Sequence, residues 1–165
     1  GISGLQVGHP SKTSVISQTL LKSTATFEEK FRTMIISTGK DASNQTLSSS
    51  LNSVWNFYTS IKNQGLIILV AECMAGLGSE TFQKLIDGRI TPEKIKNASK
   101  YEDGMENLLF LSEIQKNAQI AITSILPELY IKKLGKSMDY ILKNQGPRQK
   151  VQVIEDGART LLREN

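Results

Sequence analysis

The chain has 165 residues, of which 39% are hydrophobic, 22% charged and 6% aromatic; this is the composition of a globular domain rather than of a disordered segment. Twenty Lys and Arg against 16 Asp and Glu leave a net charge of +4, too small a surplus for a dedicated polyanion-binding protein. One cysteine and one histidine exclude an internal disulfide and a zinc site of the usual Cys and His ligands. We therefore predict a cytoplasmic protein, and the short apolar runs predict no membrane association.

The start of the chain differs in composition from the rest. The first 60 residues contain 12 Ser and 8 Thr, and residues 1–14 have no periodic apolar pattern, which is typical of a flexible leader. Apolar residues between Val15 and Leu21 predict one short helix. The chain begins with Gly1 rather than Met, as a tag remnant or a cut from a longer polypeptide would. We expect a leader over 1–14 and a single α/β domain over 15–165.

Two runs of consecutive apolar residues predict buried strands. The first run lies within residues 33–38, and the second lies within residues 66–73. The second run is continuous rather than alternating, which is the pattern of a parallel strand that is buried on both faces.

The segment between these strands has helical spacing. Apolar residues recur at positions 47, 51, 54, 55, 58 and 61, which is one stripe of an amphipathic helix. We therefore predict a helix over 47–62, ended by Gly65, with Trp55 and Tyr58 on its core-facing side.

The second half of the chain alternates helices with two further strands. We predict the last strand at 151–154, and the other elements are helices at 79–87, 105–114, 127–135 and 138–143, a short helix capped by Thr91, and a strand at 119–124. Such alternation predicts an α/β fold with three layers, namely a largely parallel open sheet of about four to five strands with helices on both faces.

Candidate ligand-binding residues follow from the rule that open α/β sheets bind ligands at the carboxyl ends of their strands. A right-handed crossover through the 47–62 helix brings the loops 39–46 and 74–79 to one edge of the sheet. The residues predicted to face one another across this edge are Lys40, Asp41, Asn44, Gln45 and Ser48 on one side and Glu72, Gly76, Gly78 and Ser79 on the other. Two ordinary structural roles are the alternatives: solvent-facing loop residues, and glycines that allow a tight strand-to-helix turn.

Three weaker patterns are interpreted structurally. Residues 135–137 read Gly-Lys-Ser, but the earlier glycine of a phosphate loop is replaced by Tyr130. Cys73 and His9 are far apart in the chain, so Cys73 is read as a small buried residue at a strand end. Six basic residues against one acid between Lys132 and Lys150 are read as a solvated helical surface, with nucleic-acid binding the less favoured alternative.

The segment Gly65–Glu80 resembles the carboxyl-terminal domain of the nickel-pincer lactate racemase family. It is similar to that family's pattern of a glycine, an apolar strand, Ala-Glu-Cys, a Gly-x-Gly turn and an acidic helix start. The stretches 34–39 and 119–134 are similar to neighbouring parts of the same domain, so the resemblance covers roughly residues 30–156. It implies that this chain is the domain that closes over substrate.

The same resemblance implies that the cofactor belongs elsewhere. In that family the amino-terminal domain holds the nickel-pincer nucleotide, and this chain has no counterpart of that domain, so no cofactor and no metal ligand are expected here. The Gln, Lys and Trp of the racemase's second domain fall at Ser48, Leu51 and Met105. Because none of these residues matches, lactate itself is not the expected substrate, and catalytic residues stay unassigned.

Three functions are thus open from sequence. The first is a substrate-closing or regulatory carboxyl-terminal domain of a lactate-racemase-like protein, inactive alone, whose partners are a missing amino-terminal domain and a 2-hydroxy acid or related anion. The second is a stand-alone module that binds an anion or phosphate at 76–79. The third is nucleic-acid binding through residues 132–150. A homo-oligomer is compatible with each of the three.

Overall fold

The computed structural model describes residue 9 and residues 25–27, 29–144, 150–160 and 162–164. The predicted leader 1–14, His9 aside, and the short helix between Val15 and Leu21 lie outside these residues. The elements are, in chain order, β1 (Ala25–Phe27), β2 (Phe31–Ser37), the 3₁₀ turn η1 (Ala42–Asn44), α2 (Leu47–Trp55), the 3₁₀ turn η2 (Tyr58–Ser60), β3 (Ile61–Val70), α3 (Glu80–Ile86), α4 (Pro92–Lys96), α5 (Met105–Asn117), β4 (Ala118–Thr123), α6 (Glu128–Leu134), α7 (Met138–Asn144), β5 (Val151–Ile154) and β6 (Leu162–Glu164).

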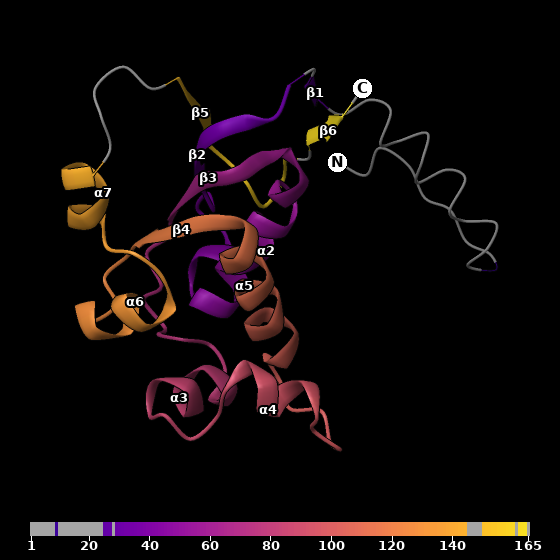
Figure 1. Ribbon diagram of the computed structural model, residues 1–165, viewed down its shortest axis with the longest axis vertical. Helices are drawn as coiled ribbons and strands as arrows, with labels where there is room; N and C mark the ends of the chain where they lie inside the picture. The colour runs from indigo at the N-terminus through magenta and orange to yellow at the C-terminus, as the bar shows by residue number, and fades with distance from the viewer. Residues whose placement is uncertain (1–8, 10–24, 28, 145–149, 161, 165) are drawn as a thin grey trace.

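Four parallel strands form the central sheet, in the order β4-β3-β2-β5 (Figure 1). The chain steps outward from β2 to β3 and β4, and then returns to place β5 on the other side of β2. Because every pairing is parallel, the carboxyl ends of β2, β3 and β4 lie at one end of the sheet and their amino ends at the other. The α/β fold predicted from the sequence is confirmed.

The two faces of the sheet are covered to different extents. The larger core lies on the face that α2 and α5 cover, where Met34, Ile36 and Ile67 are fully buried. The smaller core lies on the opposite face, where Ile141 of α7 packs with Ile68. Helices therefore cover both faces, and the sheet is the middle of three layers.

Most helix ends follow their local sequence signals. The side chain of Thr91 accepts the N–H of Lys94 at 3.4 Å, and Pro92 opens α4. The side chain of Ser79 accepts the N–H of Phe82 and begins α3. At the start of α2 the hydroxyl of Thr46 accepts the N–H of Ser49 at 3.2 Å as part of a capping box.

The predicted helix over 47–62 is wrong at its carboxyl end. Helix α2 ends at Trp55, because Phe57 turns into the core, where it is fully buried, and its N–H bonds the carbonyl of Val54. The strand β3 then begins at Ile61 rather than at residue 66, since Ile61 pairs with Phe31. Trp55 is also not a core residue: its side chain is 46% exposed and stacks on Phe110, with ring centroids 4.0 Å apart.

A second, two-stranded sheet was not predicted. It pairs β1 with β6 in parallel, with Ala25 opposite Leu162, so residues 151–154 are not the last strand. Each of these strands has three residues, too few to show a period of two. No helix among the described residues is long and apolar enough to cross a membrane.

Candidate functional site

A hollow of about 400 Å³ opens at the carboxyl ends of β2, β3 and β4. Residues from all three strand ends and the loops that follow them contribute to its lining. The lining consists of Ser37, Gly39, Asn44, Val70, Ala71, Glu72, Thr123, Ser124 and Ile125. This is the place where parallel α/β sheets bind ligands, so we call it the carboxyl-end site.

Asn44 connects two of the strand ends that form the site. Its side-chain oxygen accepts hydrogen bonds from the hydroxyl of Thr38, at 2.8 Å, and from the N–H of Glu72, at 2.7 Å. Its backbone carbonyl accepts the N–H of Cys73 at 2.9 Å. Asn44 is 7% exposed, so its side chain is a buried structural link whose edge also reaches the hollow.

The loops after β2 and β3 are joined directly through their backbones. Ala75 N–H donates to the carbonyl of Gln45 at 2.8 Å, and Leu47 N–H donates to the carbonyl of Gly76 at 3.0 Å. The N–H of Ser48 donates to the carbonyl of Leu77 at 3.0 Å. The two loops thus lie at the same end of the sheet, as the crossover rule predicts.

The predicted ligand-binding residues do not all face the hollow. Asn44 and Glu72 line it, and the residues of the prediction that do not are Lys40, Asp41, Gln45, Ser48, Gly76, Gly78 and Ser79. The hydroxyl of Ser48 instead accepts a hydrogen bond from the side chain of Asn107 at 2.9 Å. The structure therefore brings the two loops together but separates their polar side chains.

The turn at residues 76–79 uses its polar groups within the fold. The N–H of Gly76 donates to the carbonyl of Cys73 at 2.9 Å. Gly78 has φ +82°, and a Cβ there would collide with the hydroxyl of Thr46, so glycine permits the close approach of the two loops. Its neighbour Ser79 caps α3. The tight-turn role of these glycines accounts for the geometry.

The hydroxyls at the site were not predicted, although the same strand-end rule could have found two of them. Thr123 is the last residue of β4 and Ser124 follows it, just as Glu72 follows the end of β3. The Thr123 hydroxyl oxygen is buried and has no hydrogen-bond partner among the described residues. The Ser124 hydroxyl accepts the N–H of Leu126 at 3.1 Å, which leaves its own hydrogen available to donate. A carboxylate and hydroxyl donors thus share one hollow.

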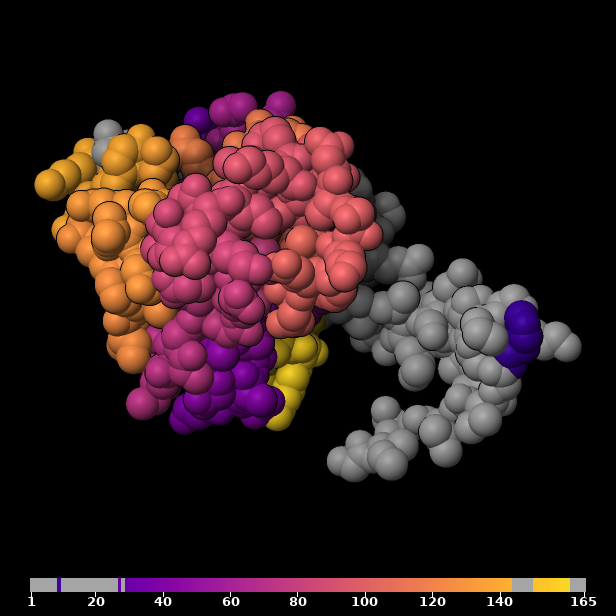
Figure 2. Space-filling view, turned by 90° about the horizontal axis from the view of Figure 1, so that it is seen from below, coloured from indigo at the N-terminus to yellow at the C-terminus, as the bar shows by residue number. Residues whose placement is uncertain are grey.

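A charged cluster borders the same end of the molecule. Arg159, in the segment after β5, forms an ion pair with Asp41 and lies 3.9 Å from a carboxylate oxygen of Asp156. In the space-filling view this segment lies against the loop after β2 (Figure 2). These contacts link the segment after β5 to the loop after β2. Between these two strands the order of the strands along the sheet reverses direction.

Cys73 is a buried residue with a strained backbone. Its side chain is 1% exposed and its φ is +57°, a left-handed conformation that few non-glycine residues adopt. Burial raises the pKa of its thiol above the ordinary value, although the nearby Ser50 hydroxyl lowers it in part. A thiol with a raised pKa is a poor nucleophile at neutral pH, which fits the structural interpretation.

The described residues offer no metal centre. Among them there is no group of three or more His, Cys, Asp or Glu side chains that could hold a metal ion. Where a nickel-pincer nucleotide would be held stays a prediction.

The fold is similar to that of a known enzyme structure. The lactate racemase apoprotein from Thermoanaerobacterium thermosaccharolyticum superposes with a TM-score of 0.77 and 22% sequence identity, over 95% of this chain and 42% of that one. No protein-family model and no curated protein sequence matches the chain. The chain thus has a lactate-racemase-like fold, and it spans less than half the length of that protein.

Proposed function

We propose that this chain is a substrate-closing or regulatory domain of a lactate-racemase-like protein, and that it holds a 2-hydroxy acid or related anion at the carboxyl-end site. The observation that carries the proposal is the grouping of Glu72, Thr123 and Ser124 around one hollow at the strand ends. The likeness of fold to lactate racemase supports the class of protein.

The chemistry of the hollow matches the two ends of such a ligand. A 2-hydroxy acid carries a carboxylate, which accepts hydrogen bonds, beside a hydroxyl, which donates one. The hydroxyls of Thr123 and Ser124 donate to the carboxylate, and the carboxylate of Glu72 accepts from the ligand's hydroxyl. Among the residues that the structure describes, no lysine or arginine lines the hollow, so its lining offers no counter-charge to the carboxylate of the ligand.

That missing counter-charge is the reason to assign the chain a closing role. Neutral hydroxyl donors bind an anion more weakly than charged donors do. A second domain that supplies a cation, the base and the nickel-pincer cofactor would complete the site, and this chain would close over the bound ligand. In that arrangement the chain alone binds weakly and turns over no substrate.

The test compares this chain with the complete polypeptide, each assayed with a panel of 2-hydroxy acids after nickel loading. We expect racemisation by the complete protein alone; turnover by the 165-residue chain contradicts the proposal.

A matched pair of variants then examines the site in the complete protein. Thr123→Val removes the unpartnered hydroxyl with little change of shape and is expected to raise KM about tenfold. Ser99→Ala removes an exposed hydroxyl in the loop between α4 and α5, outside both hollows, and should leave KM unchanged. An unchanged KM in both variants would place the substrate elsewhere.

A further inference from the structure

The amino ends of the same three strands form a second hollow, of about 280 Å³. Lys30 directly precedes β2, Lys62 lies at the start of β3, and Asn117 directly precedes β4. The remaining lining residues are Tyr58, Thr59, Ile61 and Asn63. Strands of this length separate the hollow from the carboxyl-end site by roughly 20 Å, so the two are distinct.

The charges that line this hollow are all positive. Lys30 and Lys62 have no ion-pair partner among the described residues, and no acidic side chain contributes to the lining. The lysine-rich hollow between α6 and α7 differs in this respect. There Glu128 and Asp139 join the lining, and Lys132 pairs with Glu128 at 2.8 Å. Of these two hollows, it is the amino-end one that leaves its positive charge uncompensated.

The neutral side chains add hydrogen-bond donors. The phenol oxygen of Tyr58 accepts a hydrogen bond from the side chain of Asn117 at 3.1 Å, which leaves the phenol hydrogen free to donate. The side-chain oxygen of Asn63 accepts the N–H of Gln64 at 3.0 Å, so the NH₂ group of Asn63 remains available to donate hydrogen bonds. Both residues therefore have a donor available in addition to the two ammonium groups.

A bulge in β3 places Lys62 and Asn63 at the amino-end hollow. Phe31 pairs with Ile61 and Thr33 pairs with Leu66, so a single residue of β2 lies opposite four residues of β3. Bulges occur near functional sites, where they redirect side chains. Within this bulge Gln64 has φ +60°, a conformation that costs free energy in a residue with a side chain.

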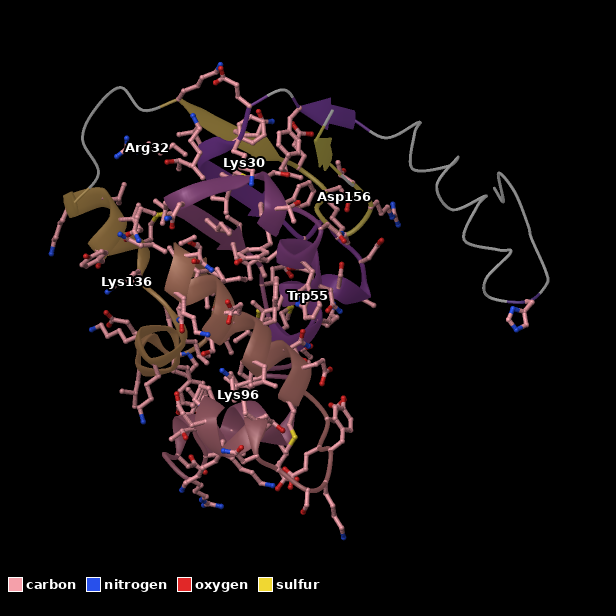
Figure 3. The ribbon with its side chains drawn as sticks, turned by 45° about the vertical axis from the view of Figure 1, so that its right-hand side comes forward. Lys30, Arg32, Trp55, Lys96, Lys136 and Asp156 are labelled. Atoms are coloured by element: carbon pink, nitrogen blue, oxygen red, sulfur yellow. The ribbon has the colours of Figure 1, made fainter. Side chains whose placement is uncertain are left out.

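Gly65 completes the bulge. A Cβ at this position would lie 2.7 Å from the carbonyl oxygen of Lys62 and 2.9 Å from that of Arg32, so the bulge folds this closely because residue 65 is a glycine. The neighbouring Lys30 projects beside β3 from the segment that leads into β2 (Figure 3). The chain thus uses a strained residue and a specific glycine to hold two unpaired lysines around one hollow.

We propose that this hollow is a binding site for a phosphate group, carried by inorganic phosphate or by a small phosphate monoester. A phosphate dianion matches the two positive charges, and its oxygens accept from the phenol and amide donors. The volume exceeds that of phosphate alone and leaves room for a small substituent. The site is independent of the function proposed above and lies at the opposite end of the sheet.

The test is a titration of the 165-residue chain followed by amide chemical shifts at constant ionic strength, with chloride as the reference anion. Inorganic phosphate forms one arm and glycerol phosphate the other. We expect saturable shifts at residues 62–65 in at least one arm. Tighter binding of the ester identifies a phosphorylated metabolite as the ligand, and equal binding identifies the phosphate itself.

Two double variants with equal loss of charge separate a built site from general attraction. Lys30→Met with Lys62→Met should weaken binding about tenfold or more, because charged hydrogen bonds are lost. Lys132→Met with Lys143→Met should leave it within about twofold, since distant exposed charges are screened. Circular dichroism checks the fold of both.

Three outcomes overturn the site: equal weakening in the two double variants, shifts centred on residues 132–143, or the absence of saturable shifts in the unmodified chain.

Discussion

The strands β2, β3 and β4 carry one hollow at each end, and the two hollows differ in how their polar groups are used. At the carboxyl end the polar groups of Asn44, Thr38 and Thr46 bond one another or the backbone. At the amino end Lys30 and Lys62 are exposed and have no acidic partner among the described residues. The difference teaches that the carboxyl end uses part of its polar groups to hold the fold and leaves Glu72, Thr123 and Ser124 for a ligand, whereas at the amino end both lysines are available to one.

The largest expected effect is at Asn44. Asn44→Ala removes the acceptor of the Thr38 hydroxyl and of the Glu72 N–H, and it leaves the Thr38 hydroxyl buried without that partner. We expect a loss of about 3 kcal/mol in the free energy of unfolding, measured by chemical denaturation. Asn44→Asp keeps an acceptor oxygen and should lose less than half as much. If the two variants are equally stable, the side-chain oxygen does not link the strands.

The glycines of the 76–79 turn give the next effect. Gly78→Ala places a Cβ against the Thr46 hydroxyl at φ +82°, and we expect a loss of about 2 kcal/mol. Gly76 has φ +84° but open space around it. Gly76→Ala should therefore cost about 1 kcal/mol, which is the cost of placing a side chain on a left-handed backbone. Thermal unfolding of the two variants measures the difference in stability. Equal losses would show that the two loops move apart and relieve the contact with Thr46.

The cap of α2 contributes less. Thr46→Ala removes the side-chain acceptor of the Ser49 N–H, and the expected loss is about 1 kcal/mol. Thr46→Ser retains the hydroxyl and serves as the control in the same denaturation experiment. A stable alanine variant would mean that Ser49 or the adjacent loop replaces the cap.

Cys73 makes the carboxyl end sensitive to alkaline pH. Burial raises the pKa of its thiol from the ordinary value of 9.0, so the unfolded chain loses this proton first as the pH rises. The contribution to stability is therefore complete below pH 9 and falls above it. Comparing the free energy of unfolding of the native chain and of Cys73→Ala between neutral and alkaline pH measures the effect. We expect the variant to have the shallower decline, and parallel declines would contradict it.

The smallest effect belongs to the amino end. Lys30→Met and Lys62→Met alter exposed side chains without ion pairs, so we expect the free energy of unfolding to stay within about 0.5 kcal/mol. A large loss of stability in either variant, measured in the same denaturation experiment, would contradict the contrast between the two ends, because the lysines at the amino end would then hold the fold as well.

The carboxyl end was the more predictable of the two. The continuous apolar run within residues 66–73 predicts a buried parallel strand, and parallel pairing then brings the loops after β2 and β3 together. What sequence could not supply was the direction of each side chain. Asn44 and Ser48 were predicted to face the crevice; Asn44 does line the hollow, but it is mostly buried between the strand ends, and the Ser48 hydroxyl bonds Asn107.

The amino end escaped prediction for two physical reasons. The apolar residues Tyr58 and Ile61 continue the stripe of α2, so periodicity extends the helix across a turn that the burial of Phe57 creates. The lysines and Asn117 are also far apart in the chain. Their proximity depends on the bulge at 62–65, which is a tertiary feature without a local signal.

The pairing of β1 with β6 has a mechanical consequence. These strands are parallel, with Ala25 opposite Leu162 and Phe27 opposite Glu164. The chain enters the pair at Ala25 and leaves it at Glu164, which are diagonally opposite corners. Tension applied at these two points therefore shears the inter-strand hydrogen bonds together instead of peeling them apart one at a time. The two-stranded sheet therefore bears such a load first, and its hydrogen bonds must break before the tension reaches the four-stranded sheet.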